Sequence, residues 1–391
     1  MTDILCFSTT DWDEIWGSRQ QVMARLATAG HRVLFVERQV GPEHLLRDPD
    51  LRIRKLSAWR WPALRPLNKN LWLWRPPLLP PGRYYSMALN RLGQSLLAAR
   101  LRPVLNELAF EQPLLWLYPP HSAPLIGQFS ERLVVYHCIE RFAGGQHGHK
   151  RKVMQAQEAD LLHDADRVFV HIEELRRLYQ PIARHTITLV PSAADVAHFQ
   201  STNVVHPVIS ALPRPRLGVS GTIDARVDVS LLYNLAYTHP DWHLILIGQV
   251  RPGRINLAPL KILPNVHFLG HRSFADLPVM LNGMDALLIP YLYNELTECI
   301  SPIKLYEYLA VGKPIISVDL PGVRPLRDWV SLAKDQTGFI QAVQDALAED
   351  DEGQRYTARR KFALEHTWEA RIKRMWDVVG AALAEEHYAA P

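Results

Sequence analysis

Short apolar runs alternate with longer amphipathic stretches along most of the chain. Such runs predict buried strands, and apolar residues spaced three and four apart predict helices. In the first half, the predicted strands lie at residues 4–8, 32–36, 114–117, 133–136, 167–171 and 188–190. A second set lies at residues 217–220, 243–247, 266–269, 286–290 and 314–318. Because strands that alternate with helices form parallel sheets, the pattern predicts an α/β protein.

A polar, proline-containing stretch separates the two sets of strands. Residues 200–203 are all polar, and Pro213 and Pro215 follow them, which is typical of a linker. A chain of 391 residues is also long for one domain. We therefore expect two Rossmann-like, doubly wound parallel-sheet domains at residues 1–205 and 214–366, facing a central cleft. Residues 367–391 are predicted to form a final amphipathic helix.

Composition and cysteine usage favour a reducing compartment. No apolar run approaches the roughly 18 residues needed to cross a bilayer, and the N-terminus leads directly into the first predicted strand. Cys6, Cys138 and Cys299 lie far apart and form no CxxC motif. We therefore expect a cytoplasmic protein without a structural zinc site.

The stretch from Leu51 to Asn106 contains many basic residues and no acidic one. It carries Arg52, Arg54, Lys55, Arg60, Arg65, Lys69, Arg75, Arg83, Arg91, Arg100 and Arg102, interleaved with Trp59, Trp61, Trp72, Trp74, Tyr84 and Tyr85. This mixture suits an anionic membrane surface, where aromatic rings lie at headgroup level. No known nucleic-acid-binding module surrounds it, so we expect no nucleic-acid partner. The alternative is that the rings pack within their own domain while the arginines are solvated.

The stretch that begins at Ser301 is the strongest local signal. Ser301 is predicted to be an N-cap, Pro302 the first helical residue, and Gly312 the position just past the helix end. The free N–H groups of a helix start attract anions, and Lys304 adds a positive charge one turn later. The alternative is a surface helix on which Lys304 and Glu307 form an ordinary ion pair. The local pattern leaves both interpretations open.

Two common nucleotide-binding motifs do not occur. The turn after the first strand, residues 8–18, contains no GxGxxG motif, and the chain has no GxxxxGK[ST] motif. A dinucleotide cofactor and a P-loop are therefore not expected. The second predicted domain opens with a strand, Gly221 and then Arg226. A diphosphate would approach the backbone at Gly221 and bind Arg226, although a plain turn glycine explains the same pattern.

Taken together, these segments resemble a known family. The resemblance depends on residues 218–226, 243–248, 265–270, 285–291 and, above all, Ser301-Pro302-Ile303-Lys304-Leu305-Tyr306-Glu307 with the residues up to Pro314. The chain is similar there to the bacterial group 1 glycosyltransferases of the GT-B fold. The resemblance implies that the second domain binds a nucleoside-diphosphate sugar and the first receives the acceptor. It also implies a last helix that crosses back to the first domain.

The same resemblance implies a reaction and a location. A sugar would pass to a hydroxyl group of a glycan or a lipid-linked glycan for an extracellular polysaccharide, without a tightly bound metal or other cofactor. The basic and aromatic stretch would then hold the enzyme on the inner face of the cell membrane.

The resemblance assigns residues that contact the donor sugar and its ribose. Glu307 matches an acidic residue that holds ribose hydroxyls, since a carboxylate accepts two hydrogen bonds. The family has another acidic residue eight positions earlier, where this chain has Cys299. The adjacent Glu298 is the candidate replacement.

The diphosphate contacts also depart from the family. A lysine is expected shortly after Arg226, but Val227 and Asp228 stand there. Lys304, together with the helix start at Pro302, is expected to neutralise the diphosphate instead.

Four side chains of the first domain are candidate bases for the acceptor hydroxyl. His137 and Glu140 lie at the end of a predicted strand, and Asp11 and Asp13 follow the first strand. A histidine near a strand end also serves as a structural hydrogen-bonding residue, and a reaction that retains configuration requires no conventional base. Two other functions stay open: a nucleotide-sugar epimerase on the same fold, and a non-catalytic nucleotide-sugar-binding subunit.

Overall fold

The computed structural model describes the chain except for residues 48, 59–62, 252–254, 350–352 and 390–391. The chain divides into two compact units: unit 1 comprises Met1–Pro191 and Ile372–Pro391, and unit 2 comprises Ser192–Arg371. Residues 192–205, assigned above to the first domain, therefore belong to unit 2. The reason is that Ala194 forms a β-bridge with Thr367, and the Ser192 hydroxyl donates to the Ser301 carbonyl at 2.9 Å.

Unit 1 is built on an eight-stranded sheet in the order β3-β4-β2-β1-β5-β6-β7-β8. Its strands are β1 (Asp3–Phe7), β2 (Arg32–Val36), β3 (Leu64–Asn68), β4 (Leu71–Trp74), β5 (Leu114–Leu117), β6 (Leu133–Cys138), β7 (Arg167–Val170) and β8 (Thr188–Leu189). All neighbouring pairs are parallel except the antiparallel pair β3 and β4. The order reverses between β1 and β5, which makes their carboxyl ends the switch point where open α/β sheets bind ligands.

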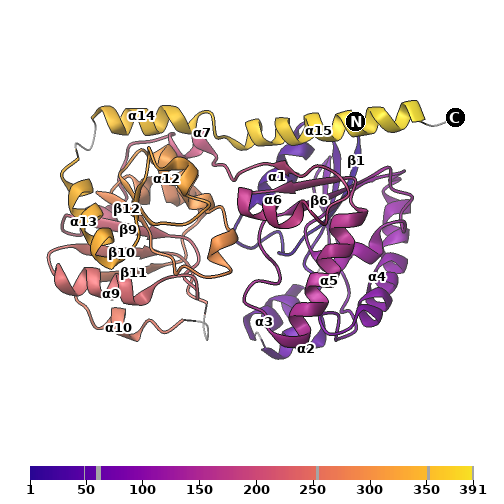
Figure 1. Ribbon diagram of the computed structural model, residues 1–391, viewed down its shortest axis with the longest axis horizontal. Coiled ribbons are helices and arrows are strands. Elements are labelled where there is room, and N and C mark those ends of the chain that lie inside the picture. Colours follow the sequence, from indigo (N-terminus) through magenta and orange to yellow (C-terminus); the bar gives the residue numbers. More distant parts are fainter. Residues whose placement is uncertain (48, 59–62, 252–254, 350–352, 390–391) are drawn as a thin grey trace. The chain divides into compact units, whose positions relative to one another are not determined.

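Helices flank the sheet of unit 1 (Figure 1). They are α1 (Ser18–Thr28), α2 (Pro42–Arg47), α3 (Pro49–Ala58), α4 (Met87–Glu107), α5 (Gly148–Asp164), α6 (Glu173–Tyr179) and, from Ile372 on, α15 (Trp368–Ala389). A 3-10 helix, η1 (Pro120–Leu125), follows β5. Helix α15 is the predicted final helix, and in unit 1 the ring of its Trp376 lies 4.0 Å from the His31 ring.

Unit 2 holds a six-stranded parallel sheet in the order β11-β10-β9-β12-β13-β14. Its strands are β9 (Arg216–Ser220), β10 (His243–Ile247), β11 (Val266–Gly270), β12 (Ala286–Ile289), β13 (Ile315–Val318) and β14 (Ser331–Ala333). Its helices are α7 (Val196–Phe199), α8 (Pro207–Ser210), α9 (Val229–Thr238), α10 (Ala258–Lys261), α11 (Leu277–Leu281), α12 (Ile303–Val311), α13 (Gln336–Leu347) and α14 (Gln354–Ala363). The strand order reverses between β9 and β12, which places a second switch point there.

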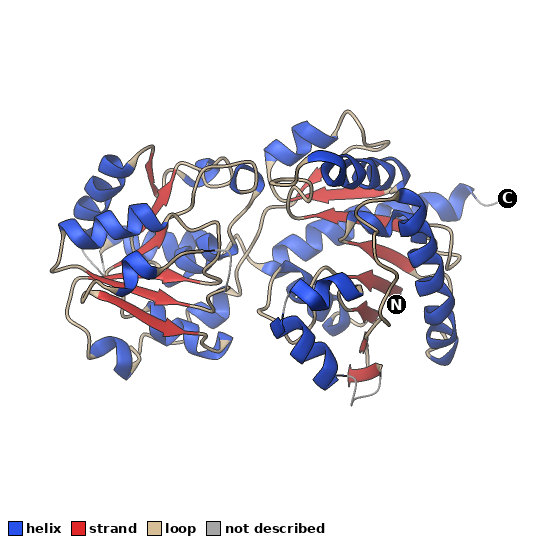
Figure 2. Cartoon of the chain, turned by 90° about the horizontal axis from the view of Figure 1, so that it is seen from below, coloured by secondary structure: helices blue, strands red, loops and turns tan. Residues whose placement is uncertain are grey.

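The predicted α/β class with two mainly parallel sheets is confirmed, and Figure 2 shows the two sets of strands, each among helices. The sequence analysis missed β3, β4 and β14. Strand β3 contains Pro66 and is largely exposed, so it lacks the apolar alternation of a buried strand. Among the described residues, no helix has both the length and the apolar character needed to cross a membrane.

Candidate functional site

Two glycines pack tightly at the switch point of unit 2. Gly221 follows β9 with φ +99°, and its N–H donates to the Ile247 carbonyl at 2.9 Å. A Cβ on Gly248, which follows β10, would lie 1.9 Å from the Gly221 carbonyl oxygen. A Cβ on Gly221 would lie 3.2 Å from the Lys304 ammonium. The backbone here therefore approaches its neighbours as only glycine permits.

Lys304 is the buried cation of this site. It belongs to the first turn of α12, and its ammonium donates to the Ser220 carbonyl at the end of β9. It also lies 5.0 Å from the centroid of the Tyr291 ring. Burial alone would lower the pKa of Lys304, but the neighbouring Tyr291 and Tyr308 outweigh burial and raise it. Lys304 is therefore charged at neutral pH.

The start of α12 differs by one residue from the prediction. Pro302 is the N-cap, Ile303 is the first helical residue, and no side chain caps the helix. The predicted N-cap role of Ser301 is wrong, because its hydroxyl instead accepts the Ser192 N–H at 3.4 Å. The C-terminal prediction is confirmed: Gly312 is the left-handed C-cap, with φ +94°. The first N–H groups of a helix have no intrahelical partner, so this uncapped end is suited to an anion.

Arg226 lies in the same region but already has a partner. Its Nε and Nη2 each donate at 2.8 Å to the carboxylate of Asp224. Burial opposes ionisation of Asp224, but the Arg226 guanidinium outweighs it and lowers the pKa of that carboxyl. Arg226 also lies 5.7 Å from the Tyr291 ring centroid. Lys304 and Arg226 therefore approach the same aromatic ring, and Asp224 offsets part of their charge.

Glu307 and Glu298 have different surroundings. Glu307 lies one turn after Lys304 on α12, and burial raises its pKa to about 7 although Lys304 opposes the shift. Glu298 is half-buried in the 3-10 helix η3 (Thr297–Cys299), and its N–H donates to the Asn294 carbonyl at 2.8 Å. Cys299 itself is buried. Of Glu298 and the adjacent Cys299, Glu298 is therefore the residue with an accessible side chain.

The structure places the candidate bases of unit 1 in unlike environments. Asp11 accepts from Lys55 at 2.8 Å, so its carboxylate is paired. The His137 ring is 1% exposed, and its Nε2 lies 3.1 Å from Nε2 of His171. Burial, followed by the nearby His171 and Arg19, lowers the pKa of His137 far below its usual value. Glu140 has a 39% exposed side chain that lies 3.6 Å from Arg19.

Sequence reasoning missed several polar partners in unit 2. The Tyr308 hydroxyl accepts the Ser220 N–H at 2.9 Å and so joins α12 to the end of β9. Asp224 pairs with Arg226 two residues later, a spacing that the sequence could have revealed. The contact between Tyr308 and Ser220 joins residues far apart in the chain, so no local sequence pattern predicts it.

Comparisons with known proteins agree with this geometry. Residues 220–349 match the family described as "Glycosyl transferases group 1". TuaH of Bacillus subtilis (strain 168), named for glycosyl transfer in teichuronic acid biosynthesis, is 24% identical over 307 residues, which cover 72% of this chain and 76% of TuaH. The matched family segment contains all of the glycine and lysine contacts described above.

Solved structures show the same fold at low identity. A trehalose 6-phosphate synthase from Burkholderia multivorans has a TM-score of 0.72 at 11% identity, covering 100% of both chains. A trehalose-6-phosphate protein from E. coli bound with UDP-2-fluoro glucose scores 0.69 at 11% identity, covering 98% of this chain and 99% of the other. WaaG, a glycosyltransferase of lipopolysaccharide biosynthesis, scores 0.66 at 13% identity, covering 96% and 99%.

The protein is therefore a group 1 glycosyltransferase with the GT-B fold. This agrees with the resemblance seen in the sequence. Of the functions left open, the comparisons favour transfer over epimerisation or non-catalytic binding.

Proposed function

We propose that unit 2 binds a nucleoside-diphosphate sugar and that the enzyme transfers its sugar to a hydroxyl group of a glycan or lipid-linked glycan. The observation that carries the proposal is the buried ammonium of Lys304 at the uncapped start of α12, beside Gly221. A buried charge is stable only when it is paired or hydrogen-bonded, and a diphosphate supplies the negative partner.

The proposed chemistry makes the diphosphate the leaving group. The bond from the sugar C1 to the phosphate oxygen breaks, the acceptor oxygen forms the new bond to C1, and the acceptor hydroxyl loses its proton. Negative charge then develops on the diphosphate, where Lys304, Arg226 and the α12 start stabilise it without reorganising. Glu307 holds ribose hydroxyls, and Glu298 reaches the sugar hydroxyls. No resident metal or other cofactor takes part in this scheme.

Glu140 is the proposed recipient of the acceptor proton. Its carboxylate is exposed, whereas Asp11 is paired with Lys55 and His137 is enclosed by aromatic rings. A general base must reach the proton that it removes, so accessibility favours Glu140 over Asp11 and His137.

Binding and product analysis together test the proposal. Thermal shift against a panel of nucleotide sugars should reveal one that raises Tm, because a ligand at 100 times its Kd stabilises by about 2.7 kcal/mol. That nucleotide sugar, incubated with glycan acceptors, should yield nucleoside diphosphate and a lengthened glycan. Epimerised sugar without an acceptor would instead support the epimerase alternative, and inertness with every acceptor would support a binding subunit.

We further propose that helix α4 of unit 1 holds the enzyme on the anionic cytoplasmic face of a membrane. Trp59, Arg60 and Trp61 lie outside the described residues. Trp74 is buried and Trp72 packs edge-on against Phe110, so these two rings do not serve as exposed anchors. Helix α4, at the edge of unit 1 in Figure 1, exposes leucines instead. These are Leu89, Leu92 and Leu96, which are 43%, 52% and 48% exposed, and they share the helix with exposed Arg91, Arg100 and Arg102.

This arrangement fits a membrane surface by its chemistry. The leucines follow helical spacing and form one apolar stripe, and each nearby arginine contributes about 1 kcal/mol against anionic lipid. TuaH and WaaG are named for teichuronic acid and lipopolysaccharide synthesis, which supports an acceptor that is built into an extracellular polysaccharide.

Liposome flotation tests the surface. The wild-type protein should float with anionic vesicles and detach as salt is raised, because the charge contribution is screened. Leu92→Ser should weaken flotation, whereas Leu178→Ser, which changes an exposed leucine of α6, should not. Equal flotation of both variants would rule out the α4 stripe.

A further inference from the structure

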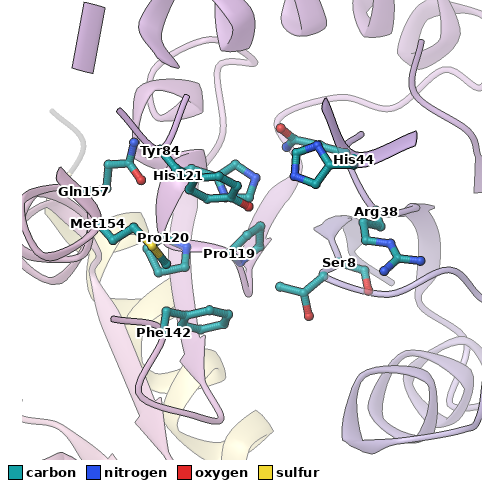
Figure 3. Close-up of a pocket in the computed structure, with 12 residues that line it drawn as sticks. Ser8, Arg38, His44, Tyr84, Pro119, Pro120, His121, Phe142, Met154 and Gln157 are labelled. Atoms are coloured by element: carbon teal, nitrogen blue, oxygen red, sulfur yellow. The ribbon is translucent and has the colours of Figure 1, made fainter. Parts of the chain in front are cut away.

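Unit 1 contains a cavity of about 130 Å³ at the switch point of its sheet (Figure 3). Its lining comes from the residues that follow three strands: Ser8 and Thr9 after β1, Arg38 and Gln39 after β2, and Pro119 to His121 after β5. Strand order reverses between β1 and β5, so the cavity occupies the position at which α/β sheets bind ligands.

A buried arginine lies behind this cavity. Arg83 is 3% exposed, and its Nη2 donates to the carbonyl of the lining residue Gln39 at 2.8 Å. Its Nε and Nη1 have no hydrogen-bond partner among the described residues. Arginine is almost never fully buried without a partner, because an uncompensated charge is costly away from water. An anion in the cavity would supply the missing compensation.

The positive field of Arg83 extends along the cavity wall. Its guanidinium carbon lies 5.2 Å from the ring centroid of the lining residue Tyr84, and the Lys150 ammonium lies 5.6 Å from the same centroid. Burial and then the charge of Arg83 lower the pKa of both His44 and His121, which also line the cavity. Both rings are therefore neutral at pH 7, and the cations of this region are arginine and lysine.

Four buried polar atoms of the lining have no hydrogen-bond partner in the described part of the chain. They are Nε2 of His121, Nε2 of Gln39, Nε of Arg38 and Oγ1 of Thr9. Nδ1 of His44 accepts the Gly41 N–H at 3.1 Å, so the neutral His44 ring carries its proton on Nε2. Arg38 is paired with Glu14 at 2.6 Å and lies 3.7 Å from the Asp11 carboxylate, but its Nε has no partner among the described atoms. The wall thus offers several donors and contains no carboxylate among its described lining residues.

The opposite wall is apolar, and the volume limits the ligand. Phe142, Met154 and Pro120 line that side in Figure 3. An engineered cavity of about 150 Å³ holds one benzene molecule, so this cavity accommodates one six-membered ring or an acidic group with its nearest atoms. A sugar ring has the matching character, with polar edges and an apolar face that packs on an aromatic ring.

We infer that this cavity binds the acidic group of a sugar residue of the acceptor, a carboxylate or phosphate, whose negative charge compensates Arg83 behind the wall and meets the Arg38 side chain in it. The inference rests on the proposed glycosyl transfer and names the substrate class of its acceptor side. A neutral sugar would leave the charge of Arg83 uncompensated, whereas an acidic one offsets it and offers partners to the unpaired Nε2 atoms of His121 and Gln39.

Binding of simple sugars to the full-length enzyme tests the inference. Calorimetry should show glucuronate or glucose 6-phosphate binding about tenfold or more tightly than glucose, as expected for a hydrogen-bonded charge pair. Inorganic phosphate is then added as a competitor of glucuronate and of glucose 6-phosphate. It should displace glucose 6-phosphate in particular, which distinguishes phosphate binding from carboxylate binding. Equal affinity of glucose and both acidic sugars would overturn the inference without any variant.

Matched variants show which residues cause the preference for acidic sugars over glucose. Arg83→Met should reduce it to about twofold or less, and Arg38→Met is the second variant if the first does not fold. Arg184→Met, at an exposed arginine of the same unit, should keep the preference. Retention of the full preference in both Arg83→Met and Arg38→Met would overturn the assignment.

Nucleotide binding separates this inference from the proposed function. Binding of UDP to wild type and variants reports on unit 2 alone. If UDP binds and glycosyl transfer occurs but no acidic preference is found, only the cavity assignment fails. If the acidic preference is present but no nucleotide sugar is bound or used, the proposed transfer fails while the anion site stands.

Discussion

The side-chain ammonium of Lys304 donates a hydrogen bond to the backbone carbonyl of Ser220, the last residue of β9. The two residues are 84 positions apart in the sequence. This contact places a full positive charge beside Gly221, at the turn that follows β9. It joins the helix start and the turn, the two parts of the proposed diphosphate site.

Replacing Lys304 should abolish most of the activity. Lys304→Met keeps the length of the side chain and removes the charge that stabilises the leaving diphosphate. We expect kcat to fall about 100-fold or more, the usual loss when one preorganised transition-state contact is removed. Steady-state kinetics with the donor identified by thermal shift would measure it. Lys334→Met, at an exposed position of unit 2, should stay within about twofold of wild type.

Unchanged kcat and KM in Lys304→Met would disprove the diphosphate role. A rise in KM alone would show that Lys304 binds the donor equally in the ground state and transition state.

Donor affinity should depend on pH through Glu307. Because burial raises the pKa of Glu307 to about 7, its carboxylate form is the minor species at pH 6 and the major one at pH 8. If the carboxylate holds ribose hydroxyls, the Kd of the donor should fall by up to about tenfold between those values. Nucleotide sugars are diphosphate diesters that do not titrate in this range, so calorimetry reports on the protein. Glu307→Gln should bind more weakly and show a flat profile; a parallel slope in the variant would assign the titration elsewhere.

Glu158 should make unit 1 less stable as pH rises. The hydroxyls of Tyr136 and Tyr179 donate to its carboxylate at 2.8 Å each, yet burial raises its pKa to about 7. The unfolded value is near 4.3, so between these values the folded state binds more protons. The free energy of unfolding therefore falls as pH rises from about 4.3 to about 7, by at most about 4 kcal/mol.

Glu158→Gln should remove this dependence. We expect Tm values close to wild type at pH 5 and higher than wild type at pH 8, measured by calorimetry. Glu307 contributes equally to both proteins and cancels in the comparison. Glu107→Gln, at an exposed carboxylate of α4, should follow the wild-type profile. A Glu158→Gln curve that runs parallel to wild type would contradict the prediction.

Gly248→Ala should disrupt the site by steric overlap. Its Cβ would lie 1.9 Å from the Gly221 carbonyl oxygen, so the β9 turn must move. We expect a loss of stability of about 3 kcal/mol and weaker binding of the donor identified by thermal shift, because overpacking next to backbone leaves no flexible side chain to yield. Chemical denaturation and calorimetry would measure the two effects.

Gly380→Ala is the matched control. Gly380 lies in α15 with nothing within 4 Å of its added Cβ. Alanine there should stabilise the helix by about 0.5–1 kcal/mol and leave binding of the same donor intact. If both alanine variants behaved alike, close packing at Gly248 would not be the cause.

Some parts of the structure followed from local sequence and others did not. The buried strands were predictable because apolar runs between turn residues have few other stable arrangements. Strand β3 was not, since its pairing with β4 holds an exposed, proline-containing segment in place. The one-residue error in predicting the start of α12 has a similar origin. The hydroxyl of Ser301, the predicted N-cap, accepts a hydrogen bond from the N–H of Ser192, which lies 109 positions away in the sequence.

The basic stretch shows how position in the fold changes the meaning of a residue. In the sequence, Arg83 and Trp74 belong to one basic, aromatic segment. In unit 1, Trp74 and Arg83 are both buried, Lys55 pairs with Asp11, and Leu92 of α4 is exposed. Local composition carries no information about which face of an element is covered.

By itself, the sequence determined the α/β class, the two sets of parallel strands, the family, and the identity of Lys304 and Glu307 as residues of interest. Periodicity and short motifs are local, so the chain alone carries them. Only the tertiary structure decided that Lys304 contacts Ser220, that Glu307 titrates near neutral pH, and that Arg83 lies uncompensated behind a cavity. These properties depend on burial and on partners far along the chain, which exist only once the sheets have formed.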